Sequence, residues 1–192
     1  MFHDPAAFPF VRELQARWRL IRQEYLELRA PVLPLHRIGA IDTYVETLMK
    51  RNGWTPSWQV DSAEPNLDWL TYGLSYKGML PDGADRALPA TSRLLSRLEG
   101  CEVCALSLMR PGTFIAPHTH PEMDGRLLIL HLGLDMAPGR SFLCVGQEVR
   151  EERPGGVVVF NGAMRHFAVN MSHADRVLLY LEFDPRIIRF CD

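Results

Sequence analysis

From Cys101 onward the sequence alternates short apolar runs with turn signals, and this pattern limits the possible fold more than any other feature. The turn signals are Arg110-Pro111-Gly112, Ala137-Pro138-Gly139, Arg153-Pro154-Gly155-Gly156 and Asn161-Gly162. The runs between them are rich in Val, Leu, Ile and Phe, which predicts strands near 103–110, 127–134, 141–145, 156–160, 166–170 and 176–183. The stretch 69–76 is compatible with a further strand. Closely spaced strands with such turns predict a β-sandwich or barrel.

Before Cys101 the apolar residues recur at helical spacing instead. One stripe comprises Leu14, Trp18, Ile21, Tyr25 and Leu28, which predicts a helix that ends near Ala30, before Pro31. Two shorter helices are predicted, one over Ile41–Arg51 and one from Thr91 or Ser92 to Glu99, with Gly100 after it. We therefore expect an α+β, mainly β chain in which N-terminal helices pack on one side of a barrel.

Length and charge bound the possible roles. The 192 residues fit a single domain, with a mostly helical part over 1–100 and the β core over 101–192. The net charge is −2 and no basic run is present, which argues against nucleic acid as a partner. No apolar run is long enough to span a membrane, and the first residues do not resemble a signal peptide, so we expect a cytoplasmic protein.

The four cysteines do not form a recognisable metal motif. Cys101 and Cys104 make a lone CxxC within a predicted strand, without the second pair or the spaced histidines that a structural zinc site requires. The pattern therefore favours two thiols in the core or at its rim over a zinc or redox site.

Histidines gather at the ends of the predicted strands. His118 and His120 form an HxH pair, and alternate residues of a strand face the same side. His166 begins a later strand that a barrel would bring close to them. Converging imidazoles suit a divalent transition metal. The alternative is that each histidine is an ordinary surface or core residue.

The segment from Met109 to Phe183 resembles the aspartyl/asparaginyl β-hydroxylase family of Fe(II)- and 2-oxoglutarate-dependent oxygenases, and the resemblance continues more weakly before residue 105. The residues that carry it are Arg110-Pro111-Gly112, Pro117-His118-Thr119-His120-Pro121, Gly125-Arg126-Leu127, His131-Leu132-Gly133-Leu134, Val157-Val158-Val159-Phe160-Asn161, His166, Asn170 and Arg176-Val177-Leu178-Leu179. The resemblance implies a double-stranded β-helix, or jelly-roll barrel, with the metal site inside it.

The resemblance also implies roles for individual residues. His118 and His166 match the iron ligands, whereas His120 stands where most 2-oxoglutarate oxygenases have a carboxylate. His120 is therefore either a third ligand or a residue directed at the second shell or the substrate. Arg176, Ser107, His131 and Trp69 match residues around 2-oxoglutarate, Arg176 being the partner of its distal carboxylate.

The implied function is hydroxylation of an amino-acid-like or peptidyl substrate, either a free small molecule or carrier-bound. Arg126 resembles a position near the substrate, although it precedes His131 by five residues instead of the usual four. Two alternatives stay open. The first is a metal-binding cupin that uses no 2-oxoglutarate, and the second is a non-catalytic ligand-binding barrel.

Overall fold

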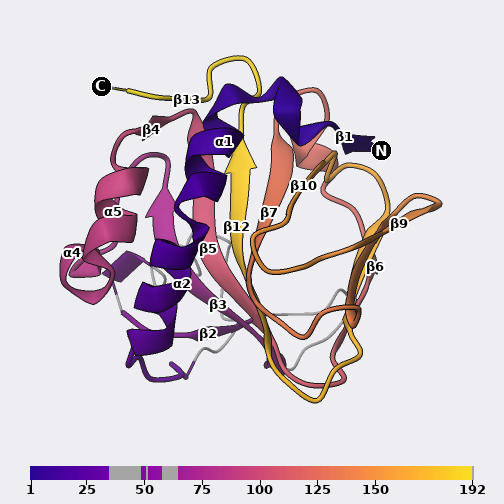
Figure 1. Ribbon diagram of the computed structural model, residues 1–192, viewed down its shortest axis with the longest axis horizontal. Coiled ribbons are helices and arrows are strands. Elements are labelled where there is room, and N and C mark those ends of the chain that lie inside the picture. Colours follow the sequence, from indigo (N-terminus) through magenta and orange to yellow (C-terminus); the bar gives the residue numbers. More distant parts are fainter. Residues whose placement is uncertain (35–48, 51, 58–64, 192) are drawn as a thin grey trace.

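Two antiparallel sheets pack face to face in the computed structural model, which describes residues 1–34, 49–50, 52–57 and 65–191 (Figure 1). The seven-stranded sheet has the order β1 (Phe2–His3), β10 (Val157–Phe160), β7 (Leu128–Asp135), β12 (Arg176–Phe183), β5 (Cys101–Met109), β3 (Asn66–Tyr76) and β2 (Thr55–Ser57). The four-stranded sheet has the order β6 (Phe114–His118), β11 (His166–Asn170), β8 (Ser141–Val145) and β9 (Glu148–Glu151). Sequence neighbours are often not sheet neighbours, which is the crossed arrangement of a jelly-roll barrel.

Helices cover the outer face of the larger sheet (Figure 1). They are α1 (Pro9–Ala16), α2 (Trp18–Glu27), α4 (Ala84–Ala87) and α5 (Pro89–Leu95). Of the 3-10 turns in the described residues, η1 (Pro5–Ala7) precedes α1 and η2 (Pro121–Met123) lies between β6 and β7. Leu14 and Ile21 of the first two helices are fully buried against leucines of the sheet such as Leu130 and Leu179. Burial of this apolar layer is the main force that holds the helices to the barrel.

The inner face of the larger sheet forms a second core. Met109, Ile129 and Phe160 pack there against Leu143 and Val145 of the smaller sheet. Because side chains alternate along a strand, the residues between the outward leucines of β7 and β12 point into the barrel. This alternation places His131 and Arg176, both buried, on the inner side.

The structure confirms the predicted strands, including the one at 69–76, which lies within β3. Six strands among the described residues were not predicted: the short strands β1, β2, β4 (Leu98–Glu99) and β13 (Arg189–Phe190), and the barrel strands β6 and β9. The sequence of β6, Phe114–His118, contains a proline, and β9, Glu148–Glu151, is mainly charged, so neither shows the apolar run on which the prediction depended.

The helix predictions need correction at their boundaries. The single N-terminal stripe is divided at Arg17 into α1 and α2, and α2 ends at Glu27. The helix predicted to reach Glu99 is α5, which begins at Pro89 because proline suits the first helical position. It ends at Leu95, since residues 98–99 form β4 (Leu98–Glu99) and pair with β13 (Arg189–Phe190). The helix predicted over Ile41–Arg51 lies mostly outside the described residues.

The remaining expectations concern thiols, surface charge and membranes. Cys101 and Cys104 are free thiols buried in the helix-facing core, as predicted.

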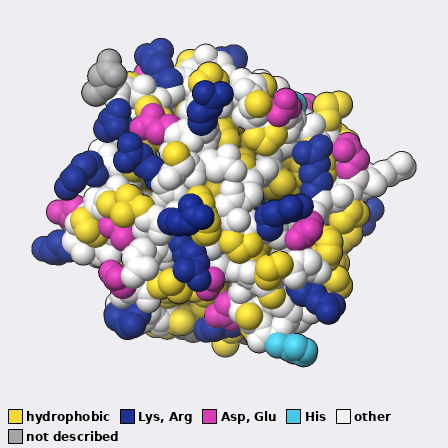
Figure 2. Space-filling view, viewed as in Figure 1, with side chains coloured by type: hydrophobic (Ala, Val, Ile, Leu, Met, Phe, Trp, Pro, Cys, Tyr) yellow, Lys and Arg dark blue, Asp and Glu magenta, His cyan; other side chains and the backbone are white. Residues whose placement is uncertain are grey.

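Cations and anions are interspersed on the face that Figure 2 shows, so that face carries no continuous basic stripe. Within the described ranges, no helix has the length and apolar character needed to cross a membrane.

Candidate metal centre

Three imidazoles converge at one end of the smaller sheet. His118 ends β6 and is the register partner of His166, the first residue of β11. His120 follows β6 and precedes η2, where its backbone N–H donates to the carbonyl of Gly162 at 2.9 Å. One ligand atom from each ring lies within 4.8 Å of the other two. The predicted convergence is therefore present, although His120 reaches the cluster through a turn and not through strand alternation.

Hydrogen bonds fix how two of these rings are oriented. Nδ1 of His118 lies 2.8 Å from the carbonyl of Ala116, and Nδ1 of His166 lies 2.8 Å from the carbonyl of Met164. A carbonyl only accepts, so each Nδ1 carries the proton and each Nε2 keeps a free lone pair. This arrangement is how metal-binding histidines are commonly held. Nδ1 of His120 lies 3.3 Å from a carboxylate oxygen of Glu122, which favours the same tautomer.

The surroundings favour neutral rings. Burial, followed by the nearby imidazoles, lowers the pKa of His166 to about 3. Burial and then His118 likewise lower the pKa of His120. Metal binding requires the unprotonated imidazole, so the lowered pKa values of His166 and His120 suit a divalent transition metal.

A buried ion pair lies deeper in the barrel. The guanidinium of Arg176, 1% exposed, donates from Nε at 2.8 Å and from Nη2 at 2.5 Å to Oε2 of Glu152. Nδ1 of His131 donates at 2.7 Å to Oε1 of the same carboxylate. Burial opposes ionisation of Glu152, but Arg176 and then His131 outweigh it and lower the pKa of Glu152 to about 2. Glu152 is therefore a buried carboxylate held by two residues that the resemblance assigned to the cosubstrate.

The other predicted cosubstrate residues lie on the same inner face. The indole N–H of Trp69 donates to Oγ of Ser107 at 3.2 Å, and Thr71 of β3 is the register partner of Ser107. Ring contacts connect this region to the metal cluster, since Phe160 has its centroid 5.1 Å from His131 and 5.2 Å from His166. The structure therefore brings Arg176, Ser107, His131 and Trp69 into one barrel interior.

Arg126 lies elsewhere. It is exposed in the turn between η2 and β7, where its charge helps to lower the pKa of Asp184 after the larger effect of Arg186. Arg126 does not join the buried group around Arg176, and its contact with a substrate stays a prediction.

Sequence reasoning missed Glu152. It follows Glu151 next to a Pro-Gly-Gly turn and has the sequence context of a surface charge. Only the tertiary pairing, in which its N–H donates to the carbonyl of Ser141 at 2.9 Å, directs its side chain inward. Sequence reasoning also missed Tyr180 and Glu182, where the hydroxyl of Tyr180 donates to the carboxyl of Glu182 at 2.7 Å.

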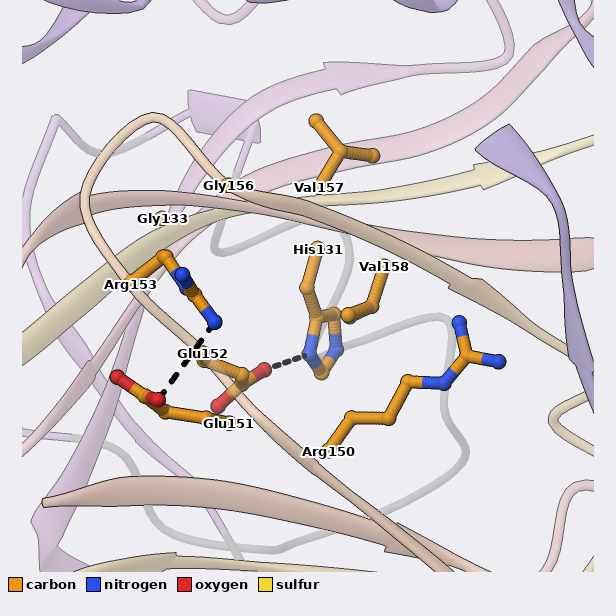
Figure 3. Close-up of a pocket in the computed structure, with 9 residues that line it drawn as sticks. All are labelled: His131, Gly133, Arg150, Glu151, Glu152, Arg153, Gly156, Val157 and Val158. Atoms are coloured by element: carbon orange, nitrogen blue, oxygen red, sulfur yellow. Dashed lines mark hydrogen bonds and ion pairs between the residues drawn. The ribbon is translucent and has the colours of Figure 1, made fainter. Parts of the chain in front are cut away.

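A cavity of about 420 Å³ opens beside Glu152, the anionic member of the buried ion pair with Arg176 (Figure 3). It is lined by His131, Gly133, Arg150, Glu151, Glu152, Arg153, Gly156, Val157 and Val158. His131 and Glu152 contact each other directly in its wall, whereas Arg153 pairs with Glu151 at its rim (Figure 3). The cavity thus joins the buried carboxylate to an exposed, cation-bearing edge of the barrel.

Comparison with known proteins finds relatives whose sequences match most of this chain. The profile of the aspartyl/asparaginyl beta-hydroxylase family matches residues 15–185. An ornithine lipid ester-linked acyl 2-hydroxylase from Rhizobium tropici is 25% identical over 94% of this chain, and the match covers 59% of that protein. The aspartyl/asparaginyl beta-hydroxylase of Mus musculus is 24% identical over 81% of this chain, and the match covers 19% of it. The chain thus corresponds to only part of each of these relatives.

Solved structures show weaker likeness. A 2OG-Fe(II) oxygenase family oxidoreductase from Burkholderia pseudomallei is 14% identical, with a TM-score of 0.49, over 82% of this chain and 95% of that one. A cupin 2 conserved barrel domain protein from Salinispora arenicola is 16% identical, with a TM-score of 0.40, over 67% of this chain and 87% of that one. At these scores neither structure distinguishes between the two classes, and the family assignment depends on the sequence match.

Proposed function

Because the chain belongs to the aspartyl/asparaginyl β-hydroxylase family, we propose that it is an Fe(II)- and 2-oxoglutarate-dependent hydroxylase. His118 and His166 would hold the metal, with His120 as a third ligand. When bound, Fe(II) and 2-oxoglutarate together supply the oxidising chemistry, in which dioxygen is consumed and the keto acid becomes succinate and carbon dioxide.

The observation that carries this proposal is the orientation of the imidazoles. In His118 and His166 the Nδ1 position is already used by a backbone carbonyl, so Nε2 is the nitrogen available to a ligand. The three rings have ligand atoms within 4.8 Å of one another, which lets one ion contact all of them. An all-imidazole set carries one negative charge less than a set with a carboxylate, which favours an anionic cosubstrate.

Arg176 supplies the second part of the proposal. Its guanidinium already binds the carboxylate of Glu152, so the site has the donor geometry that a carboxylate needs. Ser107, Trp69 and His131 lie on the same inner face of the larger sheet. We assign these four residues to the cosubstrate: Arg176 and Ser107 to the distal carboxylate, and His131 and Trp69 to the pocket wall.

The substrate class is proposed more broadly. The names of the two relatives describe hydroxylation of an acyl group in a lipid and of aspartyl or asparaginyl groups. For this chain we propose an amino-acid-like, peptidyl or carrier-bound substrate. Its approach would pass Arg126, whose exposed cation suits a carboxylate-bearing group.

Metal-dependent binding tests the proposal. We would titrate the apo-protein anaerobically with Mn(II), and then with 2-oxoglutarate, and record both events by calorimetry. We expect His118→Ala and His166→Ala to abolish the first event, and His120→Ala to weaken it. His173→Ala is the control, because His173 is an exposed imidazole outside the cluster.

The outcomes separate the candidate functions. Binding of 2-oxoglutarate only after the metal supports the hydroxylase. Metal binding with no response to 2-oxoglutarate favours a metal enzyme of the cupin kind. This result must hold both in the wild type and in Glu152→Gln, in which the Glu152 carboxylate no longer occupies Arg176. Binding of neither favours a non-catalytic barrel.

A further inference from the structure

The partner of Arg176 in this structure is a side chain of the protein itself. We propose that Glu152 is an intramolecular competitor of the cosubstrate, a carboxylate that occupies Arg176 and that leaves when the distal carboxylate of a dicarboxylate binds. This inference rests on the proposed function, and it adds a residue that sets the affinity and selectivity of the cosubstrate site.

The contacts of Glu152 reproduce those expected of a bound dicarboxylate. Oε2 accepts two N–H groups of Arg176, and Oε1 accepts the Nδ1 proton of His131. The remaining guanidinium nitrogen, Nη1, lies 3.0 Å from Sδ of Met109. Two nitrogens of Arg176 and Nδ1 of His131 are thus directed at a single carboxylate. A second carboxylate cannot use them while Glu152 stays in place.

Charge explains why the Glu152 carboxylate must be replaced by another carboxylate and cannot simply leave Arg176. Arg176 and Glu152 are 1% and 4% exposed, and an unpaired charge at such a depth is strongly unfavourable. If Glu152 leaves as a carboxylate enters, the number of buried charges stays the same. The exchange therefore avoids the desolvated, unpaired guanidinium that would result from departure of Glu152 alone.

The neighbouring cavity provides a place for the displaced side chain. Glu152 borders a space of about 420 Å³ that is also lined by Arg150 and Arg153 (Figure 3). Their side chains are 41% and 65% exposed, and they form ion pairs of 3.9 and 3.6 Å with the neighbouring Glu148 and Glu151, while Arg150 also lies over the ring of Phe2 at 4.2 Å. Rotation of Glu152 toward this edge would exchange one arginine partner for another without leaving the carboxylate unpaired.

A buried hydroxyl in the same region supports an additional ligand. Oγ of Ser141 is buried and has no hydrogen-bond partner among the residues that the structure describes. Ser141 is directly connected to Glu152, whose backbone N–H donates to the Ser141 carbonyl. Buried hydroxyls are normally satisfied, so this one is available to an oxygen atom that arrives with a ligand.

The competition has a measurable consequence. A ligand that binds only the fraction of molecules in which Arg176 is free has its apparent Kd raised by the inverse of that fraction. If Glu152 holds Arg176 in about nine molecules out of ten or more, removing its charge should lower the Kd for 2-oxoglutarate about tenfold or more.

The test compares Glu152→Gln with the wild type by anaerobic calorimetry of 2-oxoglutarate binding to the Mn(II)-loaded protein. Glu99→Gln is the control, because it removes the same charge from a residue outside the cavity, where the carboxylate pairs with the exposed cation of Arg189. We expect Glu152→Gln to bind about tenfold more tightly or better, and Glu99→Gln to match the wild type. Equal or weaker binding by Glu152→Gln overturns the inference, because Glu152 would then be a structural partner of Arg176.

A second arm is independent of metal and of 2-oxoglutarate. In metal-free Glu152→Ala, acetate replaces the missing carboxylate fragment. We expect acetate to raise the Tm of this variant, to leave the wild type unchanged and to leave Glu152→Ala/Arg176→Met unchanged. If neither the wild type nor Glu152→Gln binds 2-oxoglutarate, the proposed function fails and this arm decides the inference. A rise in Tm shows an exchangeable carboxylate site, and its absence refutes one.

Discussion

Arg176→Met should be strongly destabilising, because it leaves the Glu152 carboxylate buried without its cationic partner. Arg176 and Glu152 are 1% and 4% exposed, and removal of one member of so deeply buried a pair typically costs about 3–5 kcal/mol of unfolding free energy. The pKa of Glu152 gives a second estimate. Its displacement from 4.5 to about 2 corresponds to about 3 kcal/mol in favour of the ionised form in the folded protein.

The pH dependence follows from the same carboxylate. In the wild type its lowered pKa provides stability above pH 4.5, and this stability is lost as the pH falls toward 2. In Arg176→Met, burial without the cation should raise the pKa of Glu152 above its ordinary value. The variant then folds with Glu152 protonated at acidic pH, so the loss relative to wild type should be largest near pH 7 and smaller near pH 4.

Urea denaturation of a double-mutant cycle measures this coupling. We expect Glu152→Gln/Arg176→Met to be more stable than the two single losses predict, because both buried charges are absent and the glutamine can still accept from His131. Arg186→Met is the control, since Arg186 also pairs with a carboxylate but has a side chain that is 67% exposed; it should cause no measurable loss. A loss for Arg176→Met that is below about 1 kcal/mol, or that is the same at both pH values, would refute the reasoning.

Three further predictions concern other parts of the barrel. Burial raises the pKa of Glu182 to about 7, so its contribution to stability is complete below pH 4.5 and is lost as the pH rises to 7. Over this pH range the stability of Glu182→Gln, measured by thermal unfolding, should fall about 2–3 kcal/mol less than that of the wild type. Equal falls in the two proteins would contradict this. A Cβ at Gly133 would overlap the Arg153 carbonyl, so Gly133→Ala should lose about 1–3 kcal/mol of unfolding free energy in urea denaturation. Unchanged stability would show that the turn after Glu152 can shift to accommodate the added methyl group. Leu14→Ala should cost about 2–5 kcal/mol in the same assay because Leu14 is fully buried, against a small effect of Leu20→Ala, which alters a residue 42% exposed; equal losses would mean that the helices do not pack as described.

Much of the fold could be predicted from local pattern. Alternation along β7 and β12 directs residues such as Leu130 and Leu179 to the helices and the residues between them into the barrel, and the apolar runs that form these strands are visible in sequence. Two of the missed strands, β6 and β9, have no such pattern, since β6 contains a proline and β9 is mainly charged. They are strands because neighbouring strands β11 and β8 pair with them, which is a tertiary cause.

The candidate site shows the same division. The spacing of His118 and His120 suggested that both rings share one side, but the structure places His120 beyond the strand, where a bond to the Gly162 carbonyl holds it. The pairing of His118 with His166 needed strand ends far apart in the chain to become register partners. Local pattern therefore suggested which histidines could meet, whereas the sheet register decided that they do.

The sequence by itself determined the chemistry that this barrel has available, namely the imidazoles near the strand ends, the arginine that opens the last long strand and the apolar runs that form the strands. Only the tertiary structure decided what the arginine contacts. Glu152 and Glu151 are adjacent and chemically identical, yet one is 4% exposed and the other lies at the rim. The physical reason is that the hydrogen bond from Glu152 to Ser141 and the cation at Arg176 act across long separations in sequence, and no local pattern records such contacts.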